Sequence, residues 1–162
     1  MNIEITIGSD PEVFLKDPVT DEYIPSPGVI RGSKESPAAC NGGAVLSDNA
    51  MAEFCTEPAL SADEFAYNTK RVFDQLDSMA QDFGLVTVIA AHAKFNKGSM
   101  DSPYLQEFGC DPDFNIWTTK QNRVKADELL RDDIRVAGGH VHIGICDKDT
   151  GGCPTASFNP YV

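Results

Sequence analysis

Hydrophobic and polar residues alternate with a period of two near the start of the chain, which is the pattern of a half-buried β-strand. Residues 3–7 show this alternation, and an apolar run follows at residues 13–15. Pro11 lies between these runs and lacks a backbone donor, so we expect one interrupted strand or two short strands. In an extended chain Asp10 and Glu12 share one face, where two carboxylates repel each other unless water or a cation separates them.

A second pair of strands is predicted at residues 44–46 and 50–55, joined by a tight turn at residues 47–49. Glu53 lies in the second of these strands, with apolar residues on both sides. Burial of a carboxylate is unfavourable unless the group is paired or bound to a metal ion, so Glu53 is the strongest candidate among the acids. Glu57, at the end of the strand, is equally consistent with a solvated terminus and with a functional role.

Residues 61–83 have the clearest helical pattern in the chain. Ser61 and Glu64 form a capping box, and Gly84 suits the position just after the helix. The residues that recur at spacings of three and four are Phe65, Thr69, Val72, Phe73, Leu76, Met79, Ala80 and Phe83. We therefore predict a scaffold helix whose aromatic side chains lie in the core. After it, residues 85–95 are predicted to form one strand that is buried on both faces.

Residues 136–145 are rich in β-branched side chains and are predicted to form a strand near the end of the chain. His140 and His142 lie two residues apart and would share one face. Gly138 and Gly139, just before them, permit a bulge or the close approach of another backbone. Two adjacent imidazoles suit a metal or phosphate site, and the alternative is an exposed polar strand face that carries two histidines.

The composition limits the range of functions. A chain of 162 residues, 41% of them apolar, fits a single domain with a hydrophobic core. The net charge of −12 argues against binding to a nucleic-acid backbone, although carboxylates that hold divalent cations would still permit nucleotide binding. The sequence has no apolar run as long as a membrane span and no signal peptide at its start, so we expect no membrane association and a cytoplasmic location.

The five cysteines include Cys146 and Cys153, which flank a predicted turn and can face each other across a hairpin. In the cytosol we expect reduced thiols rather than a disulfide, and a zinc site that combines these cysteines with the histidines is an alternative. In the long loop between residues 17 and 43, Arg31 and Lys34 are candidates for contact with an anionic substrate, and solvation of both charges is the alternative.

These segments predict an α+β fold with a curved, mostly antiparallel sheet and helices on one face. Three separate strands each place polar chemistry on one face, and the uncovered side of the sheet is where these faces would meet. Acids and imidazoles that converge there would bind a divalent cation. Oxygen-rich ligation favours Mg²⁺, and the histidines extend the range to Mn²⁺.

Three motifs together resemble a known family. They are Gly8-Ser-Asp-Pro-Glu-Val-Phe14, Asp48-Asn-Ala-Met-Ala-Glu-Phe-Cys-Thr-Glu-Pro-Ala59 and Gly138-Gly-His-Val-His-Ile-Gly144. In this order they resemble the carboxylate–amine ligases, or amidoligases, of the glutamine synthetase-like fold, and most closely the branch often carried by bacteriophages. The resemblance spans roughly residues 6–145.

The resemblance implies an ATP-dependent ligase that phosphorylates a carboxylate and lets an amine attack the acyl-phosphate. Its substrates would be small-molecule or peptide carboxylates and amines, and the fold often assembles into homo-oligomers. The matching metal ligands are Asp10, Glu12, Glu53 and His140. Glu53 and His140 take the catalytic positions, and His140 and His142 the positions that contact ATP.

The sheet of that family continues past the histidine strand. The resemblance therefore implies that residues 1–162 are the N-terminal part of such a catalytic domain, truncated on its C-terminal side. Two other functions fit the same residues. One is a metal-dependent hydrolase, which would bind metal and phosphate analogues but not ATP. The other is a non-catalytic metal- or nucleotide-binding module with a decayed site, which would recruit no metal.

Overall fold

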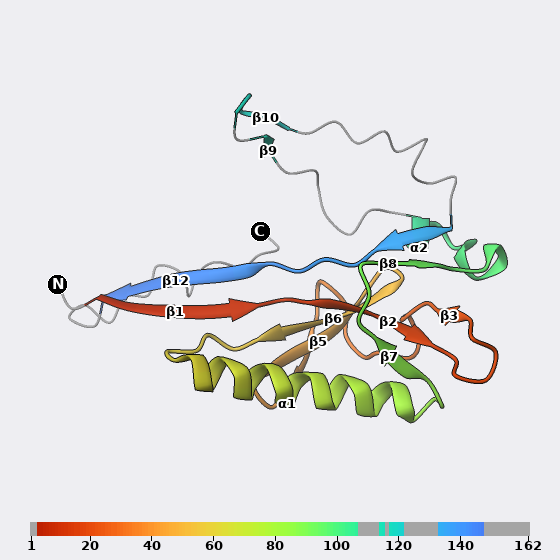
Figure 1. Ribbon diagram of the computed structural model, residues 1–162, viewed down its shortest axis with the longest axis horizontal. Coiled ribbons are helices and arrows are strands. Elements are labelled where there is room, and N and C mark those ends of the chain that lie inside the picture. The colour runs from red at the N-terminus through yellow and green to blue at the C-terminus, as the bar shows by residue number, and fades with distance from the viewer. Residues whose placement is uncertain (1–2, 107–113, 116, 122–132, 148–162) are drawn as a thin grey trace.

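The computed structural model describes residues 3–106, 114–115, 117–121 and 133–147, and it has an α+β fold (Figure 1). In chain order the elements are β1 (Ile3–Ser9), β2 (Glu12–Lys16), β3 (Tyr23–Ile24), β4 (Ala38–Cys40), β5 (Gly43–Asp48), β6 (Met51–Thr56), α1 (Ala62–Gln81), β7 (Val86–Val88), β8 (His92–Lys94), the 3-10 helix η1 (Lys97–Met100), α2 (Pro103–Gln106), β9 (Phe114–Asn115), β10 (Lys120–Gln121), β11 (Ile134–Val136) and β12 (Val141–Asp147).

The central layer is a curved, antiparallel six-stranded sheet, as the sequence predicted. Its strands follow the order β3-β2-β6-β5-β4, and β7 also pairs with β2. Three two-stranded ribbons accompany it: β1 with β12, β8 with β11, and β9 with β10. Backbone hydrogen bonds in both directions between Ile7 and Ala59, of 2.9 and 2.8 Å, join β1 to the segment that follows β6.

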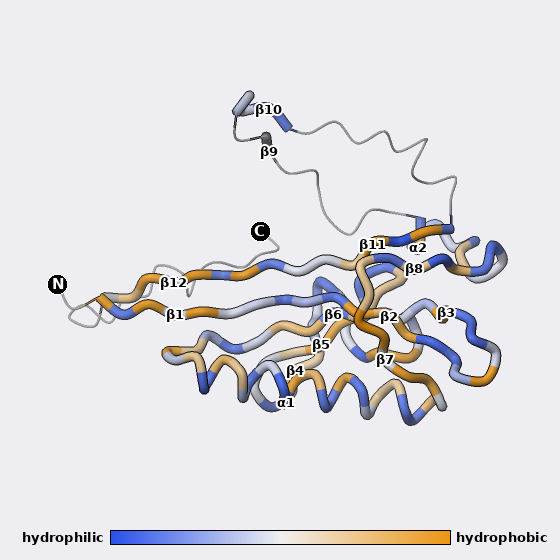
Figure 2. Tube along the Cα trace, in the orientation of Figure 1, coloured by the Kyte–Doolittle hydropathy of each residue, from blue (hydrophilic) through white to orange (hydrophobic). Residues whose placement is uncertain are grey.

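Helix α1 covers one face of the sheet, and its apolar stripe is visible in Figure 2. Ser61 caps the helix by accepting a hydrogen bond of 3.1 Å from the Glu64 amide, and Glu64 accepts one of 2.8 Å from the Leu60 amide. The buried residues of this layer are Val13, Leu15, Ile30, Val45, Ala52, Phe54, Val72, Leu76, Ala80 and Leu85. Phe73 packs against them, whereas the prediction that Phe83 lies in the core is wrong, because the chain leaves the helix before it and exposes the ring.

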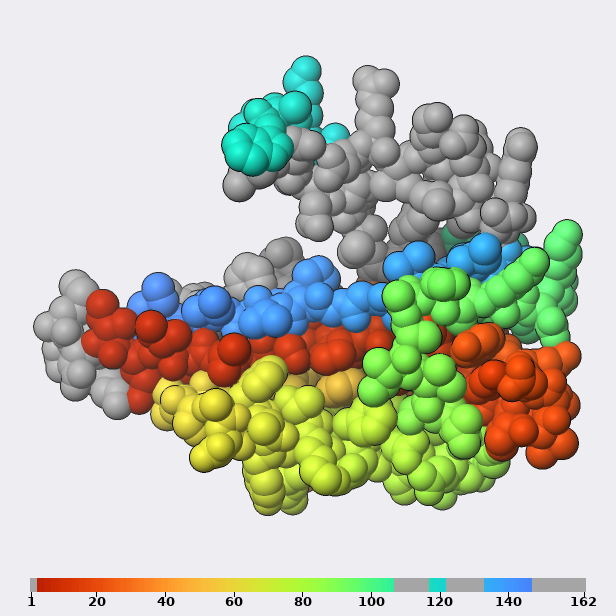
Figure 3. Space-filling model, viewed as in Figure 1, coloured from red at the N-terminus to blue at the C-terminus, as the bar shows by residue number. Residues whose placement is uncertain are grey.

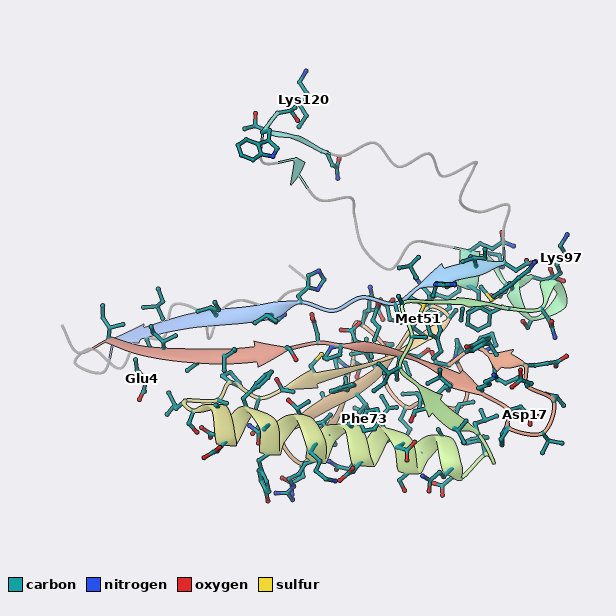
Figure 4. The ribbon with its side chains drawn as sticks, in the orientation of Figure 1. Glu4, Asp17, Met51, Phe73, Lys97 and Lys120 are labelled. Carbon is teal, nitrogen blue, oxygen red and sulfur yellow. The ribbon has the colours of Figure 1, made fainter. Side chains whose placement is uncertain are left out.

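A second, smaller core lies on the opposite face of the sheet. Phe14 and Met51 point there, because neighbouring residues of a strand alternate between faces. They pack against Phe95, against Met100 of η1 and against Leu105 of α2. Figure 4 shows Phe73 on the α1 side of the sheet and Met51 on the side of β8. The short helices thus lie on the face opposite α1, and each face has its own core.

Several predicted boundaries change. Residues 3–15 form two strands, which is the second of the two arrangements predicted for them. Residues 85–95 form β7 and β8 rather than one buried strand, because each pairs with a different partner, and Ile89 between them is exposed. The strand predicted at residues 136–145 is likewise split into β11 and β12, with the two glycines in the gap.

The turn predicted at residues 47–49 is also wrong. Strand β5 continues to Asp48, and Asn49 and Ala50 alone make the turn to β6. Asn49 adopts a φ of 51°, which asparagine tolerates better than most residues.

The state of Cys146 also differs from the prediction: this residue is disulfide-bonded, although reduced thiols were expected, and Cys153 lies outside the described residues.

None of the helices in the described part of the chain has the length and hydropathy that a membrane span requires.

Candidate functional site

Three carboxylates from three adjacent strands meet on the face of the sheet opposite α1. Glu12 of β2 lies directly opposite Glu53 of β6, and Leu46 of β5 lies opposite Glu53 on its other side. Residues directly opposite in antiparallel strands share a face, and so do residues two apart in one strand, which brings Asp48 to the same side. One carboxylate oxygen from each acid lies within 4.8 Å of the others. We call Glu12, Asp48 and Glu53 the acidic cluster.

Asp48 is the most deeply buried member of the acidic cluster, with 3% of its surface exposed. Its Oδ2 atom forms an ion pair of 2.9 Å with the Nζ atom of Lys34. Its Oδ1 atom is buried and has no hydrogen-bond partner among the described residues. A buried carboxylate oxygen normally has a hydrogen-bond donor or a cation beside it, so this atom has an unused capacity for a ligand.

Glu12 and Glu53 are both in environments that disfavour a bare negative charge. Burial raises the pKa of Glu12, and the nearby Asp48 raises it further, while the Gly138 amide opposes the shift by donating a 2.6 Å hydrogen bond to Oε2. Glu53 is only 5% exposed, and the Cys55 thiol lies 3.6 Å from its Oε1 atom. The cluster therefore concentrates negative charge in a site that water solvates poorly.

Asp10 belongs to a second group, together with the two histidines. Its Oδ1 atom accepts a 2.6 Å hydrogen bond from the His140 amide and lies 3.3 Å from the Nδ1 atom of the same residue. The Nε2 atom of His142 lies 3.1 Å from Asp10 Oδ2, and the two imidazole centroids are 6.2 Å apart. One buried carboxylate thus orients both rings, and the histidines lie together as the sequence predicted.

The two groups are connected through the backbone. The Glu12 amide donates to the Gly138 carbonyl at 3.0 Å, and the Asp10 amide donates to the His140 carbonyl at 3.3 Å. Gly139 lies between these contacts, where a Cβ atom would come within 3.0 Å of the Pro11 Cα atom. Glycine avoids this tight contact, which a Cβ atom would relieve only if the Pro11 segment shifted by a few tenths of an ångström.

The residues predicted as metal ligands are therefore distributed over both groups. Glu12 and Glu53 lie in the acidic cluster, whereas Asp10 and His140 lie in the adjacent group, and Glu57 is exposed. Among the described residues, Asp48 is the site member that the sequence did not single out, whereas Lys34 was a candidate for contact with an anionic substrate and lies instead beside Asp48. If the turn had been predicted at Asn49 and Ala50, Asp48 would have been assigned to the strand and to the same face of the sheet as Glu53.

This arrangement suits a hard divalent cation. Three carboxylates can supply oxygen ligands from a rigid sheet, and the nearby histidines can contact an anionic group that such a cation holds. Comparison with family models, with curated proteins and with solved structures finds no significant match to this chain in any of the three.

Proposed function

We propose that the protein is an ATP-dependent carboxylate–amine ligase, or the N-terminal part of one, and that its acidic cluster binds Mg²⁺ or Mn²⁺. The observation that carries the proposal is the buried Oδ1 atom of Asp48, which has no partner among the described residues and belongs to a cluster of three carboxylates. The resemblance of the three sequence motifs to amidoligases directs the proposal toward this reaction rather than toward metal binding alone.

The charges of the cluster support a divalent ion. Two unit charges at the upper limit of 4.8 Å between the ligand oxygens repel each other by about 3.5 kcal/mol at an effective dielectric constant of about 20. When all three acids are ionised, Lys34 compensates one of three negative charges and leaves two. A divalent cation would neutralise that remainder, whereas a monovalent ion would not. Oxygen ligands favour Mg²⁺, and the neighbouring imidazoles are compatible with Mn²⁺.

In the proposed reaction a substrate carboxylate oxygen attacks the γ-phosphorus of ATP, and ADP leaves. The amine then attacks the carbonyl carbon of the acyl-phosphate, phosphate leaves, and the nitrogen loses one proton. A bound divalent cation would supply charge neutralisation for the phosphoryl groups. The chain's own part is to hold the acidic cluster in register on three strands and to fix both imidazoles through Asp10, where they can donate to phosphate oxygens.

Calorimetry with MnCl₂ followed by ATP tests the proposal. The wild-type protein is expected to bind Mn²⁺, and to bind ATP much more tightly when Mn²⁺ is present. Glu53→Gln should lose both effects because it removes one of the three charges, while Glu57→Gln, an exposed glutamate in the same part of the chain, should retain both. Absence of Mn²⁺ binding by the wild-type protein would refute the proposal.

The same titration separates the proposal from the alternatives. Binding of Mn²⁺ together with vanadate or phosphate, but without any binding of ATP, would indicate a metal-dependent hydrolase. Binding of Mn²⁺ and ATP without any ADP formation, across a panel of carboxylates and amines, would indicate a non-catalytic binding module, and no binding of Mn²⁺ would indicate a decayed site.

A further inference from the structure

Tyr104 contacts the hairpin that carries Asp48, and its hydroxyl bridges two backbone groups there. The hydroxyl accepts a 3.2 Å hydrogen bond from the Asn49 amide and donates one of 3.1 Å to the Ser47 carbonyl. These two groups belong to the peptide planes on either side of the Asp48 Cα atom. Because a peptide group is planar, holding both planes fixes the two backbone dihedral angles of Asp48 and thereby the direction of its Cβ atom.

Tyr104 lies in α2, and other elements of the fold hold this short helix in place. The next residue, Leu105, is buried in the second core. Its carbonyl accepts a 2.8 Å hydrogen bond from the Arg135 guanidinium of β11, and its amide donates one of 3.0 Å to the Ser102 carbonyl. The hydroxyl of Tyr104 therefore reaches the hairpin from a support that is fixed by contacts outside the hairpin.

The carboxylate of Asp48 depends on its backbone for its direction. Lys34 pairs with the Oδ2 atom, whereas no hydrogen-bond partner among the described residues sets the direction of the Oδ1 atom. Asp48 is also the last residue of β5, next to the turn, and the tips of hairpins are the places where strands are least restrained. A metal ligand has to be held within about 0.5 Å of its binding geometry, so a restraint at this point matters for a cation site.

We propose that Tyr104 is a positioning residue of the cation site: through the two peptide groups that flank Asp48, its hydroxyl holds the Asp48 carboxylate toward the other acids of the cluster. The inference rests on the proposed function, because it concerns the cation that the acidic cluster binds. Tyr104 touches neither the cation nor a substrate in this role and acts through Asp48. Removal of a group that orients a metal ligand usually lowers metal affinity by about tenfold to a hundredfold.

A purely structural role for Tyr104 predicts a different result. If the hydroxyl only docks α2 onto the hairpin, its loss lowers the stability of the protein but leaves the bound cation unchanged. If the hydroxyl positions Asp48, its loss also weakens cation binding and alters the geometry of the ligands around the cation. The zero-field splitting in the electron paramagnetic resonance spectrum of bound Mn²⁺ reports this geometry, and a loss of stability alone does not change it.

The experiment compares the wild-type protein with Tyr104→Phe, which removes the hydroxyl and keeps the ring. Calorimetry with MnCl₂ should give a Kd about tenfold higher or more for the variant, and spectra at saturating MnCl₂ should show a different zero-field splitting. The matched control is Thr87→Val, which also removes a hydroxyl, one that donates a 2.6 Å hydrogen bond to Asp77 of α1 on the opposite side of the sheet. This control should lower the Tm but change neither the Kd nor the spectrum.

An unchanged Kd for Mn²⁺ or an unchanged spectrum of Tyr104→Phe would overturn the role of Tyr104 while leaving the proposed function intact. An equal rise in the Kd of Thr87→Val would overturn it as well, because loss of stability would then explain the effect. If the wild-type protein binds no Mn²⁺, both proposals fall.

Circular dichroism checks that Tyr104→Phe is folded. Should the variant not fold, 3-fluorotyrosine placed at position 104 of the otherwise unchanged protein takes over the test. Its ¹⁹F resonance should shift when MgCl₂ occupies the acidic cluster, because the hydroxyl is bonded to the backbone on both sides of Asp48. A resonance that stays in place at saturating MgCl₂ would overturn the role of Tyr104.

Discussion

The Glu53→Gln substitution should make the metal-free protein more stable and the metal-bound protein less stable than the wild type. Glutamine has nearly the same shape as glutamate and retains an acceptor for the Cys55 thiol, so packing around this buried position is preserved. What changes is the charge. Without a cation, the substitution removes the repulsion that Glu53 exerts on the two other acids, and with a cation it removes a ligand.

The size of the effect follows from the distances in the acidic cluster. At separations within 4.8 Å, Glu53 repels each of its two acidic neighbours by about 3.5 kcal/mol at an effective dielectric constant of about 20. The ion pair between Lys34 and Asp48 already offsets much of this repulsion. We expect a net gain of about 1 kcal/mol in the free energy of unfolding, which raises Tm by about 2–4 °C in a chain of this size.

The assay is thermal unfolding, followed by circular dichroism, in EDTA and in saturating MnCl₂. The wild-type protein should gain about 3 kcal/mol when Mn²⁺ is present at about one hundred times its Kd, and Glu53→Gln should gain little. The order of the two Tm values therefore reverses between the two buffers. Glu57→Gln controls for the loss of a negative charge as such and should behave like the wild type in both.

Two results would refute this reasoning. Glu53→Gln could lower the Tm in EDTA, which would mean that the carboxylate is satisfied without a cation. Alternatively, MnCl₂ could raise the Tm of Glu53→Gln as much as that of the wild type, and the cation would then bind elsewhere.

Three further predictions concern the surroundings of the cluster. Burial raises the pKa of Glu12, so the folded protein binds the Glu12 proton more tightly than the unfolded chain does. The stability of the metal-free protein should therefore fall as the pH rises above about 4.3 and through the pKa of Glu12 in the folded protein. Thermal unfolding at a series of pH values measures this fall, which should be absent in Glu12→Gln. Gly139→Ala should cost about 1–3 kcal/mol in urea unfolding, since its Cβ atom meets Pro11. Asp10→Ala should cost about 1–3 kcal/mol in the same assay, because the His140 amide loses its acceptor.

Each of these predictions has a result that contradicts it. A stability of Glu12→Gln that depends on pH as in the wild type would assign the effect to another group. Gly98→Ala is the control for Gly139→Ala, since a Cβ atom at Gly98 meets nothing within 4 Å, and equal losses in both would rule out the close approach to Pro11. An unchanged stability of Asp10→Ala would mean that the hydrogen bonds of Asp10 contribute nothing to folding.

Features encoded by local periodicity were predictable from the sequence. The helix α1 begins at its capping box and buries Val72, Leu76 and Ala80 at the expected spacing. The α+β class with a curved antiparallel sheet is confirmed as well. Glu53 was identified because an acid between apolar residues needs a partner, and the sheet register brings Glu12 directly opposite it. In all these cases a short stretch of sequence contained the physical reason.

Features that depend on contacts distant in the sequence were not predictable. Asp48 was assigned to a turn because Ser, Asp and Asn favour turns, yet the register between β5 and β6 makes it a strand residue that faces Glu53. Lys34 reaches Asp48 only because Gly32 packs against β5, which no periodicity reveals. Likewise, β7 and β8 separate because one pairs with β2 and the other with β11.

The pairing of β1 with β12 also depends on contacts between residues that are distant in the sequence. β1 and β12 are separated by most of the chain, yet they pair over their full described length, and Figure 3 shows them side by side along the layer that α1 covers. This pairing brings residues 138–140 against residues 10–12 and thereby joins the histidines to the acids. The sequence predicted the polar faces of three strands but not the pairing of β1 with β12 that brings the histidines to the acids.

The most direct test of the central claim is anomalous X-ray diffraction, at the manganese absorption edge, from crystals of the protein grown with MnCl₂. We predict a peak between the carboxylates of Glu12, Asp48 and Glu53, about 2.0–2.3 Å from an oxygen of each, with the Oδ1 atom of Asp48 among the ligands. An anomalous peak only at another position, or no anomalous peak at the acidic cluster under saturating Mn²⁺, would contradict the claim that the cluster binds the cation.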